Sequence, residues 1–165
     1  MKAALIVIDV QKAFFEEDES TTRSLNTAIL YINTAIEVFR KKGLPVISVQ
    51  HVNENENLVP GEEGFDLPDA LQILPSDVHI HKTYGNAFNK TPLLEELRKQ
   101  GIDTVFLTGF CAENCVLSTC RGAKDLDLTP ILIRGALAGG HPERIKFVEE
   151  VNDLISLGAL YAVLD

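Results

Sequence analysis

The sequence has no tryptophan, a single methionine and only three cysteines among its 165 residues. Basic side chains are also few: 15 Lys and Arg stand against 24 Asp and Glu, which gives a net charge of −9. Nucleic acids and anionic membrane surfaces are bound by clustered positive charge, so this balance argues against both as partners. No apolar run approaches the ~20 residues of a membrane-spanning helix.

Three cysteines are an odd number, and the first apolar stretch, Ala3–Ile8, is too short for a secretory signal. We therefore expect reduced thiols and a cytoplasmic protein. The gaps between Cys111, Cys115 and Cys120 match no common zinc framework. With 45% apolar and 24% charged residues, the composition is that of an ordinary globular protein, and we expect one domain over residues 1–165.

Short apolar runs alternate with helical patterns along the chain. The runs are rich in Val, Ile and Leu without strict alternation, which is typical of strands buried on both faces. We expect an α/β domain of three layers, with helices on both faces of a six-stranded parallel sheet. The expected strands are Ala3–Ile8, Pro45–Val52, Val78–His81, Thr104–Thr108, Pro130–Ile133 and Leu160–Leu164.

The helices between these strands have recognisable ends. An apolar stripe from Leu25 to Phe39 predicts a helix that Gly43 ends, and Pro92 and Gly101 bound a second one. A third helix carries Cys115, Thr119, Cys120 and Ala123, and a last one is expected from Pro142 to Gly158. The acidic stretch 53–77 predicts a loop with one short helix around Asp69–Ile73.

Reactive residues follow three of the expected strands, where the chemistry of parallel sheets collects. Asp9 follows the first strand, and a carboxylate there is unfavourable unless it is paired or used, so it either caps the next segment or catalyses. Lys82 follows the third strand, where a lone lysine is usually solvated. His79 and His81 share one strand face without a third ligand nearby, which favours ordinary strand histidines over a metal site.

Cys115 lies where a tight turn after the fourth strand enters a helix. The positive end of the helix dipole and its unpaired N–H groups favour a thiolate and can hold an oxyanion. We expect this helix end and Lys82 to lower the pKa of Cys115 below the ~8.5 of a free thiol, although Asp9 opposes them. Cys120, deeper in the same helix, is expected to be a small buried side chain.

Together these segments resemble the isochorismatase-like cysteine hydrolases, which include nicotinamidases, N-carbamoylsarcosine amidohydrolase and ureidoacrylate amidohydrolase. The similarity extends over nearly the whole chain. It is carried by Asp9-Val10-Gln11 with Phe14, by Lys82 with Tyr84 and Phe88, and by Gly109 through Val116.

The resemblance implies a catalytic triad of Asp9, Lys82 and Cys115. It also implies an oxyanion hole made by the backbone N–H groups of Cys111 and Cys115, a cis peptide between Phe110 and Cys111, and strand order 3-2-1-4-5-6. Lys82 must then cross two strand spacings, roughly 10 Å, so the segment from Lys82 to Phe88 must fold back across the sheet. Substrate is expected to contact Gln11, Phe14, Tyr84 and Phe88.

The chain also departs from the family. Nicotinamidases bind a divalent metal through Asp-x-His and a further His, whereas the corresponding stretch here is Gln50-His51-Val52-Asn53. Isochorismatases proper lack the cysteine. We therefore expect no metal and no cofactor. Arg134-Gly135 stands where many members have Asp-Ala, and the role of that change, like a substrate contact of His51 or Glu113, stays open.

The expected function is hydrolysis of a C–N bond in a small amide or carbamoyl compound through a thioester on Cys115. Two other classes stay open, a non-catalytic α/β binding or signalling domain and a family member that serves as a scaffold. Isochorismatase-type or nicotinamidase-type substrates are further alternatives. Leu30 and Tyr31 add apolar surface outside the buried helix stripe, so we expect a homodimer or a higher symmetric oligomer.

Overall fold

A computed structural model describes residues 1–164. At its centre is a six-stranded sheet in the order β3-β2-β1-β4-β5-β6, and all neighbouring strands run parallel. The predicted α/β class and strand order are confirmed. The strands are β1 (Ala3–Ile8), β2 (Val46–His51), β3 (Val78–Lys82), β4 (Thr104–Phe110), β5 (Thr129–Ala138) and β6 (Leu154–Ile155).

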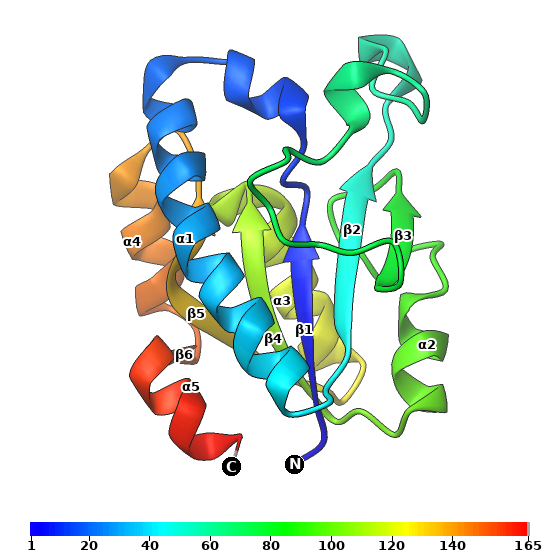
Figure 1. Ribbon diagram of the computed structural model, residues 1–165, viewed down its shortest axis with the longest axis vertical. Coiled ribbons are helices and arrows are strands. Elements are labelled where there is room, and N and C mark those ends of the chain that lie inside the picture. Colours follow the sequence, from blue (N-terminus) through cyan, green and yellow to red (C-terminus); the bar gives the residue numbers. More distant parts are fainter. Residues whose placement is uncertain (165) are drawn as a thin grey trace.

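Helices cover both faces of the sheet (Figure 1). Helices α1 (Glu19–Lys41) and α5 (Leu157–Val163) pack on one face. The other face is covered by α2 (Leu93–Lys99), α3 (Leu117–Asp125) and α4 (Pro142–Glu150). None of the helices in residues 1–164 has the length and apolar character needed to cross a membrane.

Strand β1 lies in the middle of the sheet and is buried on both faces. Leu5 and Val7 belong to the core under α1, whereas Ile6 and Ile8 belong to the core under α2, α3 and α4. Because successive side chains point to opposite faces, a strand covered on both sides has no polar position. This is why its sequence is a continuous apolar run, and the predicted bounds of this strand match the observed ones.

The prediction for the C-terminal end of the chain is wrong. The sequence predicts the sixth strand at Leu160–Leu164, but Leu160 lies in α5 and Leu164 is the C-cap residue of that helix. Both leucines are buried in the core that α1 shares. The Ser156 hydroxyl accepts the N–H of Ala159 and caps this helix. A spacing of four residues therefore places both leucines on one helical face.

The sixth strand instead comes from the stretch predicted as the end of the last helix. Helix α4 stops at Glu150, and Leu154–Ile155 pairs with Leu132 and Ile133 of β5. Gly158, expected to end a helix, lies inside α5. The sequence pattern here has an apolar spacing that a helix and a short buried strand share, so periodicity alone does not separate them.

The short helix expected around Asp69–Ile73 is also absent. That stretch is a turn whose backbone is held by Asn33 of α1, which donates to the carbonyl of Ala70 and accepts from the N–H of Gln72. These long-range hydrogen bonds replace those of a helix. The loop 53–77 instead contains two single 3₁₀ turns, η2 (Glu54–Glu56) and η3 (Glu63–Phe65).

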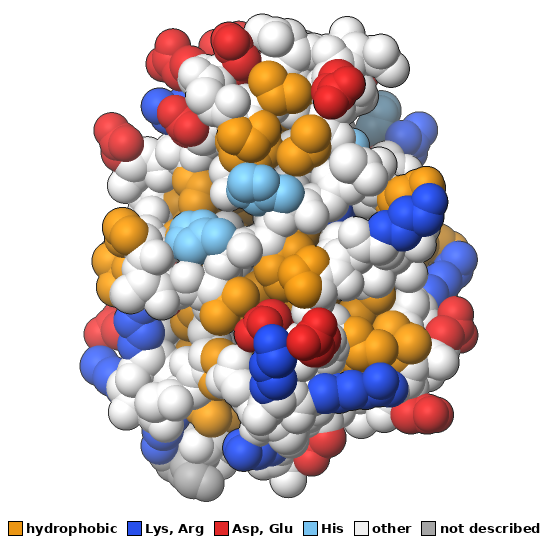
Figure 2. Space-filling view, turned by 90° about the vertical axis from the view of Figure 1, so that its right-hand side faces the viewer, with side chains coloured by type: hydrophobic (Ala, Val, Ile, Leu, Met, Phe, Trp, Pro, Cys, Tyr) orange, Lys and Arg blue, Asp and Glu red, His pale blue; other side chains and the backbone are white. Residues whose placement is uncertain are grey.

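The outer edge of the sheet is the face shown in Figure 2, where acidic and basic side chains are interspersed and histidines lie among apolar groups. His79 and His81 are exposed on β3. His79 Nε2 lies 2.9 Å from the carbonyl oxygen of Leu74, and the His81 ring packs edge-on against Phe65. These local contacts fit the interpretation of ordinary strand histidines.

Gly109 allows β1 and β4 to approach closely just before the reactive residues. It has φ +114°, and a Cβ built there would lie 2.1 Å from the carbonyl oxygen of Ile8. The obstructing atom is backbone, so it cannot move aside without displacing the sheet. Gly109 is thus required by both conformation and space.

We predict that Gly109→Ala lowers the free energy of unfolding by about 3 kcal/mol or more. The matched control is Gly158→Ala, because Gly158 lies in α5, a Cβ added there would have no atom within 4 Å, and alanine favours a helix. Urea unfolding followed by circular dichroism measures both variants. Equal midpoints for Gly109→Ala and the wild-type protein would refute this account of the β1–β4 contact.

Candidate active site

Asp9 leaves the carboxyl end of β1 in a left-handed conformation, with φ +52°. Aspartate tolerates this region better than most residues, and such positions cluster at functional sites. The residue is 1% exposed. One of its carboxylate oxygens, Oδ1, is buried and has no hydrogen-bond partner among the described residues. The chain thus holds a buried carboxylate with one oxygen unused.

Lys82 is the last residue of β3, and strand alternation places it on the same face as Ile80, toward α3. The residue is also 1% exposed, and its side chain extends past the end of β2 to Asp9. The ammonium has four close neighbours: Asp9 Oδ2 at 2.9 Å, His51 Nδ1 at 2.9 Å, the carbonyl oxygen of Tyr84 at 3.0 Å and Cys115 Sγ at 3.3 Å.

The segment after Lys82 does fold back across the sheet, as predicted. The N–H of Ala87 donates to the hydroxyl of Thr119 on α3. A Cβ built on Gly122 of the same helix would meet the Asn86 side chain at 2.3 Å, so this contact is close. The segment thereby bridges β3 and α3, and it brings the carbonyl of Tyr84 to the ammonium of Lys82.

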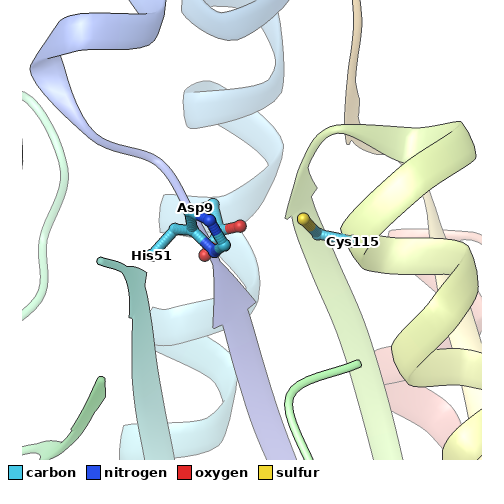
Figure 3. A group of neighbouring side chains, drawn as sticks. All are labelled: Asp9, His51 and Cys115. Atoms are coloured by element: carbon cyan, nitrogen blue, oxygen red, sulfur yellow. The ribbon is translucent and has the colours of Figure 1, made fainter. Parts of the chain in front are cut away.

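Cys115 lies in a single π-helical turn, η4 (Ala112–Val116), that leads from β4 into α3. The peptide bond between Phe110 and Cys111 at the start of this turn is cis. The carbonyl of Cys111 accepts the N–H groups of Asn114 and Val116, which closes the turn. Figure 3 shows the Cys115 side chain pointing from this turn toward Asp9, with His51 beside Asp9 at the end of β2.

The surroundings of Cys115 keep its thiol protonated in the free protein. Burial raises the pKa of Cys115 to about 11, and the Asp9 carboxylate adds to this effect, whereas Lys82 opposes it. The expected lowering of this pKa is therefore wrong, because removal from water outweighs the lysine. Burial also raises the pKa of Asp9 above its ordinary value, against the lowering effect of Lys82.

A cavity of about 440 Å³ opens onto this cluster. Asp9, His51, Cys111 and Cys115 line it together with Phe14, whose ring packs 4.8 Å from that of Phe110. The remaining lining residues come from the segment that enters α1, the loop after β2, the end of β4 with the turn η4, and the start of α4. This volume suits a small molecule.

Phe14 thus lines the cavity, but the other three residues expected to contact substrate do not. Gln11 is fully buried, and its amide donates to the carbonyl of His51 and accepts the His51 N–H, so it joins the ends of β1 and β2. Phe88 packs in the core beneath α2 and α3. Tyr84 is exposed and contributes its backbone carbonyl to Lys82.

His51 and Glu113, whose contact with substrate stayed open in the sequence analysis, both line the cavity. An ammonium cannot accept a hydrogen bond, so His51 Nδ1 accepts from Lys82 and the ring proton lies on Nε2. Burial and the neighbouring Lys82 accordingly lower the pKa of His51. Glu113 accepts from the Cys111 thiol at 3.0 Å and pairs with Arg144 at 3.2 Å.

His51 carried a usable sequence signal, because it stands at the carboxyl end of a strand, like Asp9 and Lys82. Arg144 carried none, since it lies on a surface helix that only the fold brings to the cavity. Arg134-Gly135 lies away from the cavity, within β5, where Gly135 has φ +84° and faces the ring of Tyr31.

The residues present do not fit a metal ion. Donor atoms of Asp9, His51 and Cys115 lie within 4.8 Å of one another, the one such group of three in residues 1–164. However, Lys82 Nζ is within 3.3 Å of a donor atom on each of them, so a positive charge already occupies the place that they surround. A divalent cation there would meet strong repulsion from the ammonium.

The protonated state of the thiol predicts how it reacts with iodoacetamide. Only the thiolate is alkylated, so labelling of Cys115 should rise about tenfold per pH unit between pH 7 and 10. Cys111, whose pKa burial and Glu113 raise to about 12, should react more slowly. Peptide mapping by mass spectrometry measures each site. A labelling rate for Cys115 that levels off at or below neutral pH would contradict this protonation state.

Asp9→Asn should accelerate this labelling at least several-fold at a given pH, because it removes a charge that raises the pKa of Cys115. Asp125→Asn, a carboxylate exposed at the end of α3, is the matched control and should leave the rate unchanged.

Comparison with known proteins places this geometry in a family. A sequence model of the Isochorismatase domain matches residues 3–149. The isochorismatase family protein YrdC of Bacillus subtilis (strain 168) is 34% identical over 139 residues, which cover 83% of this chain and 74% of that protein.

Solved structures agree. An isochorismatase-like hydrolase from Alkaliphilus metalliredigens superposes with a TM-score of 0.90 over 100% of both chains, at 22% identity, and shows the same fold. N-carbamoylsarcosine amidase from Thermoplasma acidophilum is 27% identical, with a TM-score of 0.82 over 95% of this chain and 97% of that one. The chain therefore belongs to the isochorismatase family of hydrolases.

Proposed function

We propose that this protein is a cysteine hydrolase that cleaves the C–N bond of a small amide or carbamoyl compound through a thioester on Cys115. The observation that carries the proposal is the contact of the buried Lys82 with the buried Asp9 and the half-buried Cys115, which both line a cavity of about 440 Å³. A nucleophile and a base that both contact a fixed positive charge are the parts that such a reaction needs. The similarity to an amidase supports a C–N substrate.

In the first step the thiol of Cys115 gives its proton to Asp9 while the sulfur attacks the substrate carbonyl. The raised pKa of Asp9 makes it a stronger base than an ordinary carboxylate, and its free oxygen, Oδ1, is available to accept the proton. Lys82 lies against both groups and stabilises the negative charge as it moves from carboxylate to sulfur.

The negative charge then develops on the carbonyl oxygen of the tetrahedral intermediate. We assign its stabilisation to the backbone N–H groups of Cys111 and Cys115, which belong to the turn that lines the cavity. When the intermediate collapses, the C–N bond breaks, the leaving nitrogen takes the proton from Asp9, and a thioester remains on Cys115.

Water completes the cycle. Asp9 takes a proton from a water molecule while the oxygen of that water attacks the thioester carbonyl. The C–S bond then breaks, and the proton returns from Asp9 to the sulfur of Cys115. The product is an acid from an amide, or a carbamate from a carbamoyl compound. No cofactor takes part in these steps. We propose that residues 1–165 act as one such hydrolase domain in the cytoplasm.

The test is a panel of primary amides and ureido acids with ammonia release as the readout. Cys115→Ala should reduce turnover of any substrate found by at least about 10³-fold and leave folding intact, because it removes the nucleophile. Lys82→Met should also lower kcat strongly. A thioester trapped by acid quench should map to Cys115 by mass spectrometry.

Cys120→Ala is the matched control, because Cys120 is a buried thiol outside the cavity. It should keep the activity of the wild-type protein at a temperature where both are folded. Full activity of Cys115→Ala would reject the mechanism. No turnover of any amide, together with hydrolysis of a vinyl ether, would favour an isochorismatase-type reaction, and no turnover of either would favour a binding domain or scaffold.

We also propose that the protein associates as a homodimer or a higher symmetric oligomer through α1, α4 and α5. These helices flank the end of the sheet that β5 and β6 form, on the left in Figure 1. Large apolar side chains are exposed there, led by Leu30 at 68% and Phe147 at 52%. Exposed apolar groups gathered on one side are typical of an interface.

Light scattering at micromolar concentration should give a mass at least twice the 18.2 kDa of the chain. Leu30→Glu with Phe147→Glu should lower that mass, because burying the new charges is unfavourable. Leu74→Glu, at an exposed leucine outside these helices, should not change it. An 18 kDa species alone in the wild-type sample would contradict association.

A further inference from the structure

The charges around the cavity are unevenly paired. Asp9 is paired with Lys82 and Glu113 with Arg144, while Asp18 caps α1 by accepting the N–H and hydroxyl of Thr21. This leaves two lining carboxylates, Glu17 and Glu56, without a basic partner. Within residues 1–164, no lysine or arginine nitrogen lies within 4.0 Å of either one.

Several other glutamates on the surface do have such a partner. Glu19, Glu37, Glu95 and Glu150 each lie within 4.0 Å of a basic side chain four residues away on the same helix. Glu17 and Glu56 come instead from separate segments, the end of η1 (Lys12–Glu16) and the turn η2, and they meet at one cavity. The proximity of Glu56 and Asp18 contributes, after burial, to a raised pKa of Glu17.

A second cavity, of about 360 Å³, continues the acidic surface outward. It shares Phe14, Glu17 and Glu56 with the first cavity, so the two adjoin. Its lining adds Glu62 and Glu63 and includes no lysine or arginine. Lys12 approaches Glu63 at 4.0 Å from outside this lining. A path of negative charge thus leads away from the thiol.

The floor of the first cavity also has an unsatisfied group. Asp9 lines it, and the Oδ1 atom of this carboxylate is buried and has no hydrogen-bond partner among residues 1–164. Buried polar atoms are nearly always paired in the working state of a protein. The site therefore has a free acceptor at its floor and two unpaired carboxylates at its rim.

We infer that the substrate carries a positively charged group, an ammonium or a guanidinium, at the end away from the scissile carbonyl, and that Glu17 and Glu56 bind this group. The inference rests on the proposed hydrolysis for the position of the carbonyl at Cys115. A carboxylate at the distal end would meet Glu17 and Glu56 as like charges, and a neutral group would leave them unpaired. A cation turns the same two carboxylates into a specificity determinant.

Three amides of similar size and different charge test this: 4-aminobutanamide, pentanamide and glutaramate, which end in an ammonium, a methyl and a carboxylate. Shorter and longer ω-amino amides adjust the reach. Binding is measured by calorimetry with full-length Cys115→Ala protein, so that it does not depend on turnover, and ammonia release is measured with the wild-type protein. The best ω-amino amide should bind about 10-fold tighter than its neutral counterpart, and the anionic one should bind weakest.

Glu17→Gln and Glu56→Gln in that background should each reduce this preference about 5-fold while leaving the affinity for the neutral amide unchanged. Glu37→Gln removes the same charge from the far end of α1 and should leave the preference unaltered. Raising the salt from about 0.05 M to about 0.5 M should weaken binding of the cation only.

The outcomes separate the two proposals. A preference for the cation without ammonia release keeps this inference and rejects the hydrolysis. Ammonia release with no preference, or with a preference for the neutral or anionic amide, rejects this inference and keeps the hydrolysis. Failure of every ω-amino amide to bind also overturns the assignment of Glu17 and Glu56.

Discussion

One buried ammonium organises the site. Lys82 Nζ is the shared neighbour of a carboxylate, an imidazole, a carbonyl and a thiol that come from separate segments of the chain. A lysine and an aspartate out of contact with water are unfavourable to bury, and removing one partner leaves the other uncompensated. The ion pair between Lys82 and Asp9 therefore holds the ends of β1 and β3 in a fixed position relative to each other. The thiol of Cys115 takes its electrostatic environment from that pair.

The sheet makes this contact possible. Parallel strands in the order β3-β2-β1-β4 bring their carboxyl ends to one edge, and only β2 separates the lysine from the aspartate. Gln11 ties the end of β1 to His51 at the end of β2, and Gly109 lets β4 approach Ile8 without a side chain in between. The positions of Asp9, Lys82 and Cys115 thus depend on residues such as Gln11 and Gly109, to which we assign no step of the reaction.

Much of the fold was predictable from local patterns, because strands buried on both faces leave a continuous apolar signal such as Ala3–Ile8. The C-terminal end was not, because Leu160 and Leu164 fit either a strand or a helical face, and contact with α1 decides between them. The three candidate catalytic residues were predicted through the spacing of segments that resemble a family. Glu17 and Glu56 had no such signal, since each is an ordinary exposed acid until the fold places both at one cavity.

The direction of the Cys115 pKa shift shows what local reasoning leaves out. A helix start and a neighbouring lysine predict a lowered pKa for a cysteine, but burial and the Asp9 carboxylate raise the pKa of Cys115 by more. A thiol that stays protonated is protected from adventitious alkylation and oxidation, which both require the thiolate. In the mechanism that we propose, it becomes nucleophilic when a substrate carbonyl is positioned to accept the sulfur as Asp9 accepts the proton. In this arrangement the chemistry is coupled to binding, so the groups that hold the substrate help to decide when the nucleophile forms.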